Sequence, residues 1–231
     1  MFDGFPEETI RFFLDLRFHN ETPWFHAHRQ EYEAYVRRPF ADFIEALAPT
    51  MRQIAGDIET RPGRCLARIN RDIRFTRDKS PYRDHMWLLL RRAGEEREHS
   101  VMYWFELSPE VVEWGLGFWG PNRPAMDALR KRMLQKPGDV TRVLRRCGLP
   151  DRELMLYGDD YRKLKTPPQL PAELARLYGK KELYLKRVGT PLSVCYTPSL
   201  IQKVRTDFLR LAPLYHLLRL AADEGRQQLD A

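Results

Sequence analysis

The chain has 231 residues, of which 43% are hydrophobic and 31% charged, and 12 Phe and 5 Trp supply large packing groups. This composition is typical of a folded globular protein and excludes a long disordered chain. The net charge of +7 favours anionic partners, among them nucleic acid, phosphorylated metabolites and lipid surfaces, and charge alone selects none of these classes. Because small basic clusters are spread along the chain and interrupted by acidic residues, a diffuse surface charge is the simplest interpretation.

Three cysteines, Cys65, Cys147 and Cys195, lie far apart and form no C-x-x-C pair. A disulfide framework and a cysteine-rich zinc site are therefore not expected, and a reducing compartment is the natural location. No signal-peptide pattern stands at the N-terminus, and no apolar run approaches the roughly 20 residues of a membrane span. We therefore expect a cytoplasmic protein with no membrane partner, folded as a single domain over residues 1–231.

The first quarter of the chain is predicted to be helical. Residues 7–17 place apolar side chains on neighbouring turns and acidic residues in the first turn, where they suit the helix dipole. A second helix is predicted to begin near Thr22, and a third to begin at Pro39 and end near Ile54, because proline is favoured in a first turn. One side of the second helix carries Phe25, Arg29, Tyr32 and Val36.

Between about residues 64 and 118 the pattern changes to short β-prone runs separated by turn signals. We expect four or five mostly antiparallel strands here, with turns at residues 92–97 and 108–110. The predicted elements that follow are helices at 126–133, 139–147, 198–210 and 213–222, a loop at 165–171 and a short strand at 183–186. The predicted fold class is therefore α+β, with N-terminal helices, a central sheet and a C-terminal helical layer.

Residues 68–82 carry the densest polar pattern of the chain. They read Arg-Ile-Asn-Arg-Asp-Ile-Arg-Phe-Thr-Arg-Asp-Lys-Ser-Pro-Tyr. Interpreted as a strand, the first half turns alternate side chains to opposite faces. One face would consist of Arg68, Asn70, Asp72 and Arg74. The other would consist of Ile69, Arg71, Ile73 and Phe75.

The polar face of this segment favours an anion site. Asp72 lies within reach of Arg74 or Asn70 and would hold the guanidinium groups in fixed orientations. The loop that follows adds further hydrogen-bond donors near the strand end. The predicted ligand is a small molecule that carries a phosphate or a carboxylate. The predicted ligand-binding residues are Arg68, Asn70, Asp72, Arg74, Asp78, Lys79 and Tyr82.

Two other interpretations of the segment stay open. In one, the chain is a nucleic-acid-binding module, in which the same arginines join Arg71, Arg77 and Arg83 in an exposed stripe along a phosphate backbone. In the other, the charges form a buried, fully paired network, and the chain is a scaffold or interaction protein. We prefer the anion site, because an interleaved acid suits a defined ligand better than sequence-independent backbone contact.

The remaining chemical motifs are weak. His26 and His28 point to different faces of a helix, and His28 with Glu31 is only a pair, so no metal site is predicted. His85 follows the charged loop, but a lone histidine is more often packed or exposed, and no catalytic residue is assigned. The sequence has no P-loop, dinucleotide-binding glycine pattern, nucleophile elbow or zinc-protease helix. These patterns specify no cofactor, reaction or oligomeric state, and leave open whether the chain is an enzyme.

The segment at residues 68–82 resembles the hallmark of the DUF2461 family, whose members typically read R-I-x-R-D-x-R-F-x-x-D-K-[ST]-P-Y. Further points of similarity are Asn20, Trp24-Phe25, Tyr32, Pro39, Gly115-x-Gly117, Arg130 and Pro213-Leu214. The resemblance covers almost the whole chain. It implies a shared architecture and a shared polar centre, and it implies no particular reaction.

Overall fold

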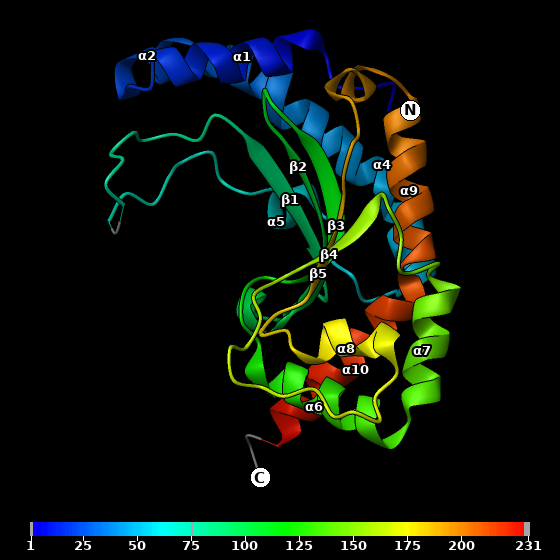
Figure 1. Cartoon of the computed structure of the whole chain (residues 1–231). Coiled ribbons are helices and arrows are strands. Elements are labelled where there is room, and N and C mark those ends of the chain that lie inside the picture. Colours follow the sequence, from blue (N-terminus) through cyan, green and yellow to red (C-terminus); the bar gives the residue numbers. More distant parts are fainter. Residues whose placement is uncertain (1, 75, 229–231) are drawn as a thin grey trace. The chain divides into compact units, whose positions relative to one another are not determined.

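A computed structural model describes residues 2–74 and 76–228 (Figure 1). It confirms the α+β class, because helices accompany a five-stranded antiparallel sheet with the order β1-β2-β3-β5-β4. The strands are β1 (Met86–Arg91), β2 (Val101–Leu107), β3 (Val112–Phe118), β4 (Leu154–Tyr157) and β5 (Tyr184–Arg187). The turns predicted at residues 92–97 and 108–110 connect β1 to β2 and β2 to β3.

The prediction that the sheet lies within residues 64–118 is wrong in part, since only β1, β2 and β3 come from this range. The short strand predicted at residues 183–186 is confirmed as β5, which pairs with β3 on one side and β4 on the other. Gly117 of β3 lies opposite Tyr184, and a Cβ at Gly117 would come within 2.3 Å of the Tyr184 Cβ. A glycine is therefore needed where these two strands meet.

The strand predicted over residues 68–75 is not formed in its described part, residues 68–74. Residues 66–71 pair with residues 81–88 only through isolated bridges, at Leu66 with Leu88 and at Asn70 with Tyr82. At the tip, side chains replace a partner strand, since Asp72 Oδ1 accepts from the Arg74 N–H and Lys79 Nζ donates to the Ile73 carbonyl. Such local bonds compete with a strand ladder. Phe75, the last residue of the predicted strand, lies outside the described residues.

The N-terminal helices agree with the predicted ones at most of their ends. They are α1 (Glu7–Phe18), α2 (Thr22–Ala27), α3 (Arg29–Glu31), α4 (Arg38–Ile54) and α5 (Pro62–Cys65), with the π-helix η1 (Tyr32–Arg37) before α4. The second predicted helix is thus divided into three pieces.

Pro39 explains the wide turn of η1. Proline has no N–H, so the Tyr35 carbonyl loses its usual helical donor and accepts instead from the buried Thr9 hydroxyl. One residue earlier, the Arg38 N–H donates to the carbonyl of Glu33, five residues back. The π-turn therefore shifts the side chains around Arg37 and Arg38 relative to a regular helix.

The C-terminal helices are α6 (Arg123–Gln135), α7 (Pro137–Arg146), α8 (Ala172–Tyr178), α9 (Ser199–Arg210) and α10 (Ala212–Gln227). All except α8 match predicted helices. Gly225 brings α10 against α6, since a Cβ there would lie 2.5 Å from the Pro124 carbonyl carbon. No helix in the described residues is both long enough and apolar enough to cross a membrane.

The chain forms two compact units. Unit 1 consists of the described residues of Met1–Leu90, Trp104–Trp114 and Thr190–Arg205. Unit 2 consists of those of Arg91–Tyr103, Gly115–Gly189 and Thr206–Ala231. The expectation of a single domain stays a prediction.

Each unit has its own buried aromatic cluster. In unit 1, Phe105 packs against Phe43 with ring centroids 4.6 Å apart, and Phe5 stacks on Phe105. In unit 2, Tyr103 packs on Phe208 with centroids 4.6 Å apart and donates a hydrogen bond of 3.1 Å to the Phe208 carbonyl. Burial of such rings is the main stabilising term of each core.

Candidate functional site

The polar segment, residues 68–82, belongs to an irregular hairpin that lies before the N-terminal end of β1 and extends beyond it (Figure 1). The Arg71 N–H donates to the Pro81 carbonyl and the Arg83 N–H to the Ile69 carbonyl, each over 2.8 Å. These bonds fix the base of the hairpin. The tip, residues 72–80, has no partner strand among the described residues.

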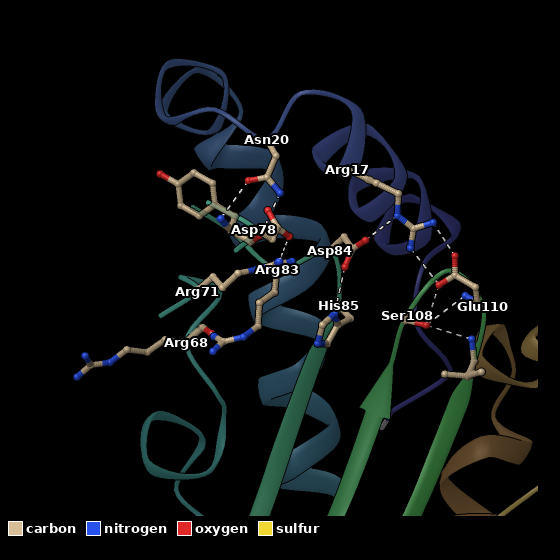
Figure 2. Close-up of polar contacts among 12 residues, drawn as sticks. Arg17, Asn20, Arg68, Arg71, Asp78, Arg83, Asp84, His85, Ser108 and Glu110 are labelled. Atoms are coloured by element: carbon tan, nitrogen blue, oxygen red, sulfur yellow. Dashed lines mark hydrogen bonds and ion pairs between the residues drawn. The ribbon is translucent and has the colours of Figure 1, made fainter. Parts of the chain in front are cut away.

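Asn20, which follows α1, holds the base of the hairpin. Its side-chain amide donates to the Tyr82 carbonyl and accepts from the Tyr82 N–H, both at 3.0 Å (Figure 2). The Tyr82 ring is buried and stacks on Phe25 of α2, with centroids 4.1 Å apart. A primary amide is the side chain that can replace a neighbouring strand in this way, because it carries both a donor and an acceptor.

The charges at the tip are satisfied locally. Arg74 makes a two-point ion pair with Asp72, at 2.7 and 3.0 Å, and this holds the pKa of Asp72 down at about 2. Asp78 accepts from the Ser80 N–H and hydroxyl and pairs with Arg71, and the Ser80 bonds are the largest cause of its lowered pKa. Both aspartates stay ionised at neutral pH. Their negative charges offset the positive charges of Arg74 and Arg71, with which they pair.

A pocket of about 650 Å³ lies beside the base of the hairpin, within unit 1. Its lining comes from α2, α3, η1, α4, α5 and residues 66–70. Its charged and polar lining residues are His26, Arg29, Glu33, Arg37, Arg38, Arg68 and Asn70. Phe25, Tyr32 and Tyr82 supply aromatic lining.

The arginines of this pocket outnumber its acids by four to one. Glu33 is paired with Arg37 at 2.9 Å, one turn away on the same helix. Among the described residues, no carboxylate forms an ion pair with Arg29, Arg38 or Arg68. Figure 2 shows the Arg68 side chain extending away from the ion pairs of the hairpin. Three guanidinium groups around one pocket therefore keep their hydrogen-bond donors available.

The π-turn contributes directly to this arrangement. Arg37 and Arg38 stand at the junction of η1 and α4, where the turn has five-residue spacing. Wide turns of this kind are frequent at functional sites, because they present side chains that a regular helix would direct elsewhere. Here the turn brings consecutive arginines into the lining of one pocket.

The pocket brings together Arg68, Asn70 and Tyr82 of the predicted binding residues. The others, Asp72, Arg74, Asp78 and Lys79, lie at the tip and are not part of the lining. Sequence reasoning missed His26, Arg29, Arg37 and Arg38. One signal was present for Arg29, which interrupts an otherwise apolar helical stripe.

A second polar cluster fastens the start of β1 to the rest of unit 1 (Figure 2). Arg17 of α1 donates to Asp84 at 2.6 Å and to both oxygens of Glu110, and His85 Nδ1 lies 3.1 Å from the second Asp84 oxygen. Burial by itself would raise the pKa of Asp84, but the bonds from His85 and Arg17 outweigh it and lower that pKa. Since each carboxylate here is already paired, we assign this cluster to the fold.

No group of three or more potential metal-binding side chains is found among residues 2–74 and 76–228. The features that remain define an α+β protein with a basic, partly aromatic pocket beside a charged hairpin. The model of the family described as "Conserved hypothetical protein (DUF2461)" matches residues 8–217, so the chain belongs to this family. A comparison with curated proteins found no match.

Proposed function

We propose that the protein binds a small molecule bearing a phosphate or carboxylate in the unit 1 pocket, through Arg29, Arg38 and Arg68. The observation that carries this proposal is that these guanidinium groups line one pocket and have no carboxylate partner in the part of the chain that the structure describes. Guanidinium groups make short, charge-assisted and often bidentate bonds to such anions. Asn70 and His26 supply further polar contacts in the same lining.

The size of the pocket supports a small-molecule ligand. Its volume of about 650 Å³ falls within the range of ligand sites in proteins, roughly 300–1,000 Å³. The aromatic side chains of Phe25, Tyr32 and Tyr82 offer apolar contact to the uncharged part of the ligand. The proposed ligand therefore carries an anionic group on an organic body.

The nucleic-acid alternative is less well supported, because two arginines of its expected stripe are engaged within the hairpin. Arg71 pairs with Asp78, and Arg83 donates to the Arg68 and Asn70 carbonyls and stacks on Trp87. A cytoplasmic location is part of the proposal, and the three free, buried cysteines support a reducing compartment.

The test is a calorimetric titration of the purified chain with inorganic phosphate, sugar phosphates, nucleotides and dicarboxylates at low and moderate salt. Arg68→Gln removes one pocket charge, and Arg64→Gln removes the same charge from exposed Arg64 of α5, which is not part of the lining. We expect at least one ligand to bind the wild type and the Arg64 variant equally and the Arg68 variant roughly tenfold more weakly, the loss for one charge-assisted bond. Equal weakening in both variants would mean that net charge alone attracts the ligand and would refute the proposal.

The scaffold alternative predicts a different result. If the arginines only stabilise the fold, no compound binds, and Arg68→Gln lowers the thermal midpoint more than Arg64→Gln does. A short oligonucleotide serves as the nucleic-acid arm of the titration. Affinity for it that falls steeply with salt and depends on Arg77 would favour the nucleic-acid alternative.

A further inference from the structure

Two tyrosines of the unit 1 pocket are buried but leave their hydroxyl groups unpaired. Tyr32 is 8% exposed and Tyr82 is 5% exposed, and both belong to the pocket lining. Within residues 2–74 and 76–228, neither hydroxyl makes a hydrogen bond. Most buried polar groups have a partner, because leaving one without a partner costs free energy. Two such groups in one lining therefore indicate that their partners come from outside the chain.

The hydroxyl ends of both side chains reach the pocket. The phenol oxygens of Tyr32 and Tyr82 are not among the unpaired side-chain atoms that are fully buried in the described part of the chain. Each oxygen therefore keeps some accessible surface. Since the rest of each side chain is covered by protein and both residues line the pocket, this surface opens into the pocket.

Neighbouring rings hold these hydroxyl groups in place. The ring of Tyr32 packs against Phe12 and Phe25, with centroids 5.9 and 5.2 Å away. Phe25 also stacks on Tyr82, whose backbone is bonded twice to the Asn20 side chain. Burial raises the pKa of Tyr32 to about 12, so its hydroxyl stays protonated at neutral pH and can donate. Groups that are fixed before binding lose little conformational entropy when a ligand binds.

A third neutral polar group, the side-chain amide of Asn70, lines the same pocket. It too has no hydrogen-bond partner in the described parts of the chain, since only the backbone carbonyl of Asn70 is engaged, by Arg83. A phenol hydroxyl can donate and accept, and a primary amide carries both a donor and an acceptor. Ligand hydroxyl groups have the same double capacity, whereas a hydrocarbon chain offers neither. These three groups therefore favour a ligand with a hydroxylated body.

A sugar phosphate suits the remaining lining as well. The C–H face of a sugar ring can pack on an aromatic side chain such as Phe25, while the hydroxyl groups at the edge of the sugar ring stay free to bond. Arg29, Arg38 and Arg68 favour a phosphate over a carboxylate, because none of them has a carboxylate partner among the described residues. A phosphate monoester carries close to two negative charges at neutral pH and three strong acceptor oxygens.

We propose that the ligand of the unit 1 pocket is a sugar phosphate or a related polyol phosphate, whose hydroxyl groups bind to Tyr32, Tyr82 and Asn70. This inference rests on the proposed function, because the arginines that would bind the phosphate are those of the anion site. It makes the two tyrosine hydroxyls specificity-determining groups, which distinguish a hydroxylated phosphate from an alkyl phosphate of the same charge.

The test is a calorimetric titration of the intact chain with pairs of phosphates that share carbon number and charge. Glycerol 3-phosphate, ribose 5-phosphate and glucose 6-phosphate are compared with propyl, pentyl and hexyl phosphate, and inorganic phosphate is the reference. At least one hydroxylated compound should bind about tenfold more tightly than its alkyl counterpart, through hydrogen bonds to the neutral polar groups. A pocket that favoured apolar contact would reverse this order, because the alkyl phosphates bury more apolar surface.

Tyr32→Phe removes one hydroxyl, keeps the ring, and should weaken binding of the preferred sugar phosphate about fivefold. Its affinity for inorganic phosphate and for the alkyl phosphate should stay within about twofold of wild type, since neither ligand has a hydroxylated body. Tyr35→Phe is the matched control, because Tyr35 belongs to the same π-helix, is 37% exposed and is not part of the lining. It should leave all three affinities unchanged. Thermal melting checks that both variants are folded.

The possible outcomes separate this inference from the anion site. Arg68→Gln should weaken binding of every phosphate, whereas Tyr32→Phe should weaken binding of the hydroxylated one alone. The inference is overturned and the anion site retained if the phosphates bind but no hydroxylated compound binds more tightly than its alkyl counterpart. The same holds if Tyr32→Phe has no larger effect than Tyr35→Phe. If no phosphate binds at all, the proposed function is refuted and this inference with it.

Discussion

The charged hairpin presents two groups of residues that differ in their partners. At the tip, Asp72 and Asp78 neutralise the arginines beside them. At the base, Arg68 lines a pocket with Arg29 and Arg38, and none of the three has an acidic partner among the described residues. The density of charge along the sequence therefore points to the tip, whereas the charges that stay unpaired after folding point to the pocket at the base. The proposed anion site follows the unpaired charges, because an arginine that is already paired must break that pair to bind a ligand.

The largest effect that sharpens this comparison concerns Tyr82, which belongs to the base. Tyr82→Ala removes a buried ring from its stack on Phe25 and should lower the free energy of unfolding by about 3–4 kcal/mol. Denaturant titration measures this change. Tyr82→Phe is the control, and it should cost less than about 1 kcal/mol, since it keeps the ring. A large loss in the phenylalanine variant would show that the hydroxyl, and not the stack, holds the base.

A smaller effect is expected at Asp84, whose partner Arg17 is partly exposed. Asp84→Asn should lower the free energy of unfolding by about 1 kcal/mol at pH 7. Because folding lowers the pKa of Asp84 from its ordinary value of 3.8, the stabilisation is present above that pH and is lost as pH falls through the folded-state value. Denaturant titrations at pH 7 and pH 3 should therefore show a smaller difference between wild type and variant at pH 3. A constant difference would mean that the ion pair does not stabilise the fold.

The smallest effect is predicted for the tip. The double variant Arg74→Gln, Lys79→Gln removes two exposed positive charges that lie outside the pocket lining. Its affinity for the anionic ligand should stay within about twofold of wild type at moderate salt, where distant surface charges are screened. Calorimetry with the ligand identified for the wild type measures this. A tenfold loss would place the binding site on the tip, as the alternating pattern of the sequence first indicated.

Much of the fold follows from local sequence patterns. The amphipathic period of residues 7–17 and the turn signals at 92–97 and 108–110 predicted elements that are present. The alternation at residues 68–75 was misleading, because Asp72 and Lys79 bond to nearby backbone groups and no strand forms. The strand β4 was missed, because its sequence Leu-Met-Leu-Tyr is a short run of consecutive apolar residues without the alternation of a half-buried strand.

The pocket was only half predictable for a similar reason. Arg68 and Asn70 belong to a recognisable motif, but Arg37 and Arg38 lie about thirty residues earlier in the sequence and reach the same pocket through tertiary packing. Their position also depends on the π-turn before Pro39, which requires the Thr9 hydroxyl of another helix to satisfy a backbone carbonyl. Neither helical propensity nor the hydrophobic period of the sequence predicts a contact such as the one between Thr9 and the Tyr35 carbonyl.

The most direct test of the central claim is an NMR titration that follows the arginine side-chain Nε–Hε signals while phosphate, and then the preferred ligand, is added. The account predicts that the signals of Arg29, Arg38 and Arg68 shift together along one binding curve, while Arg74 stays unchanged. If Arg74 shifts on that curve and the pocket arginines do not, the tip binds the anion and the account is contradicted. If every exposed arginine shifts weakly and without saturation, the protein attracts anions through its net charge alone, which contradicts the account as well.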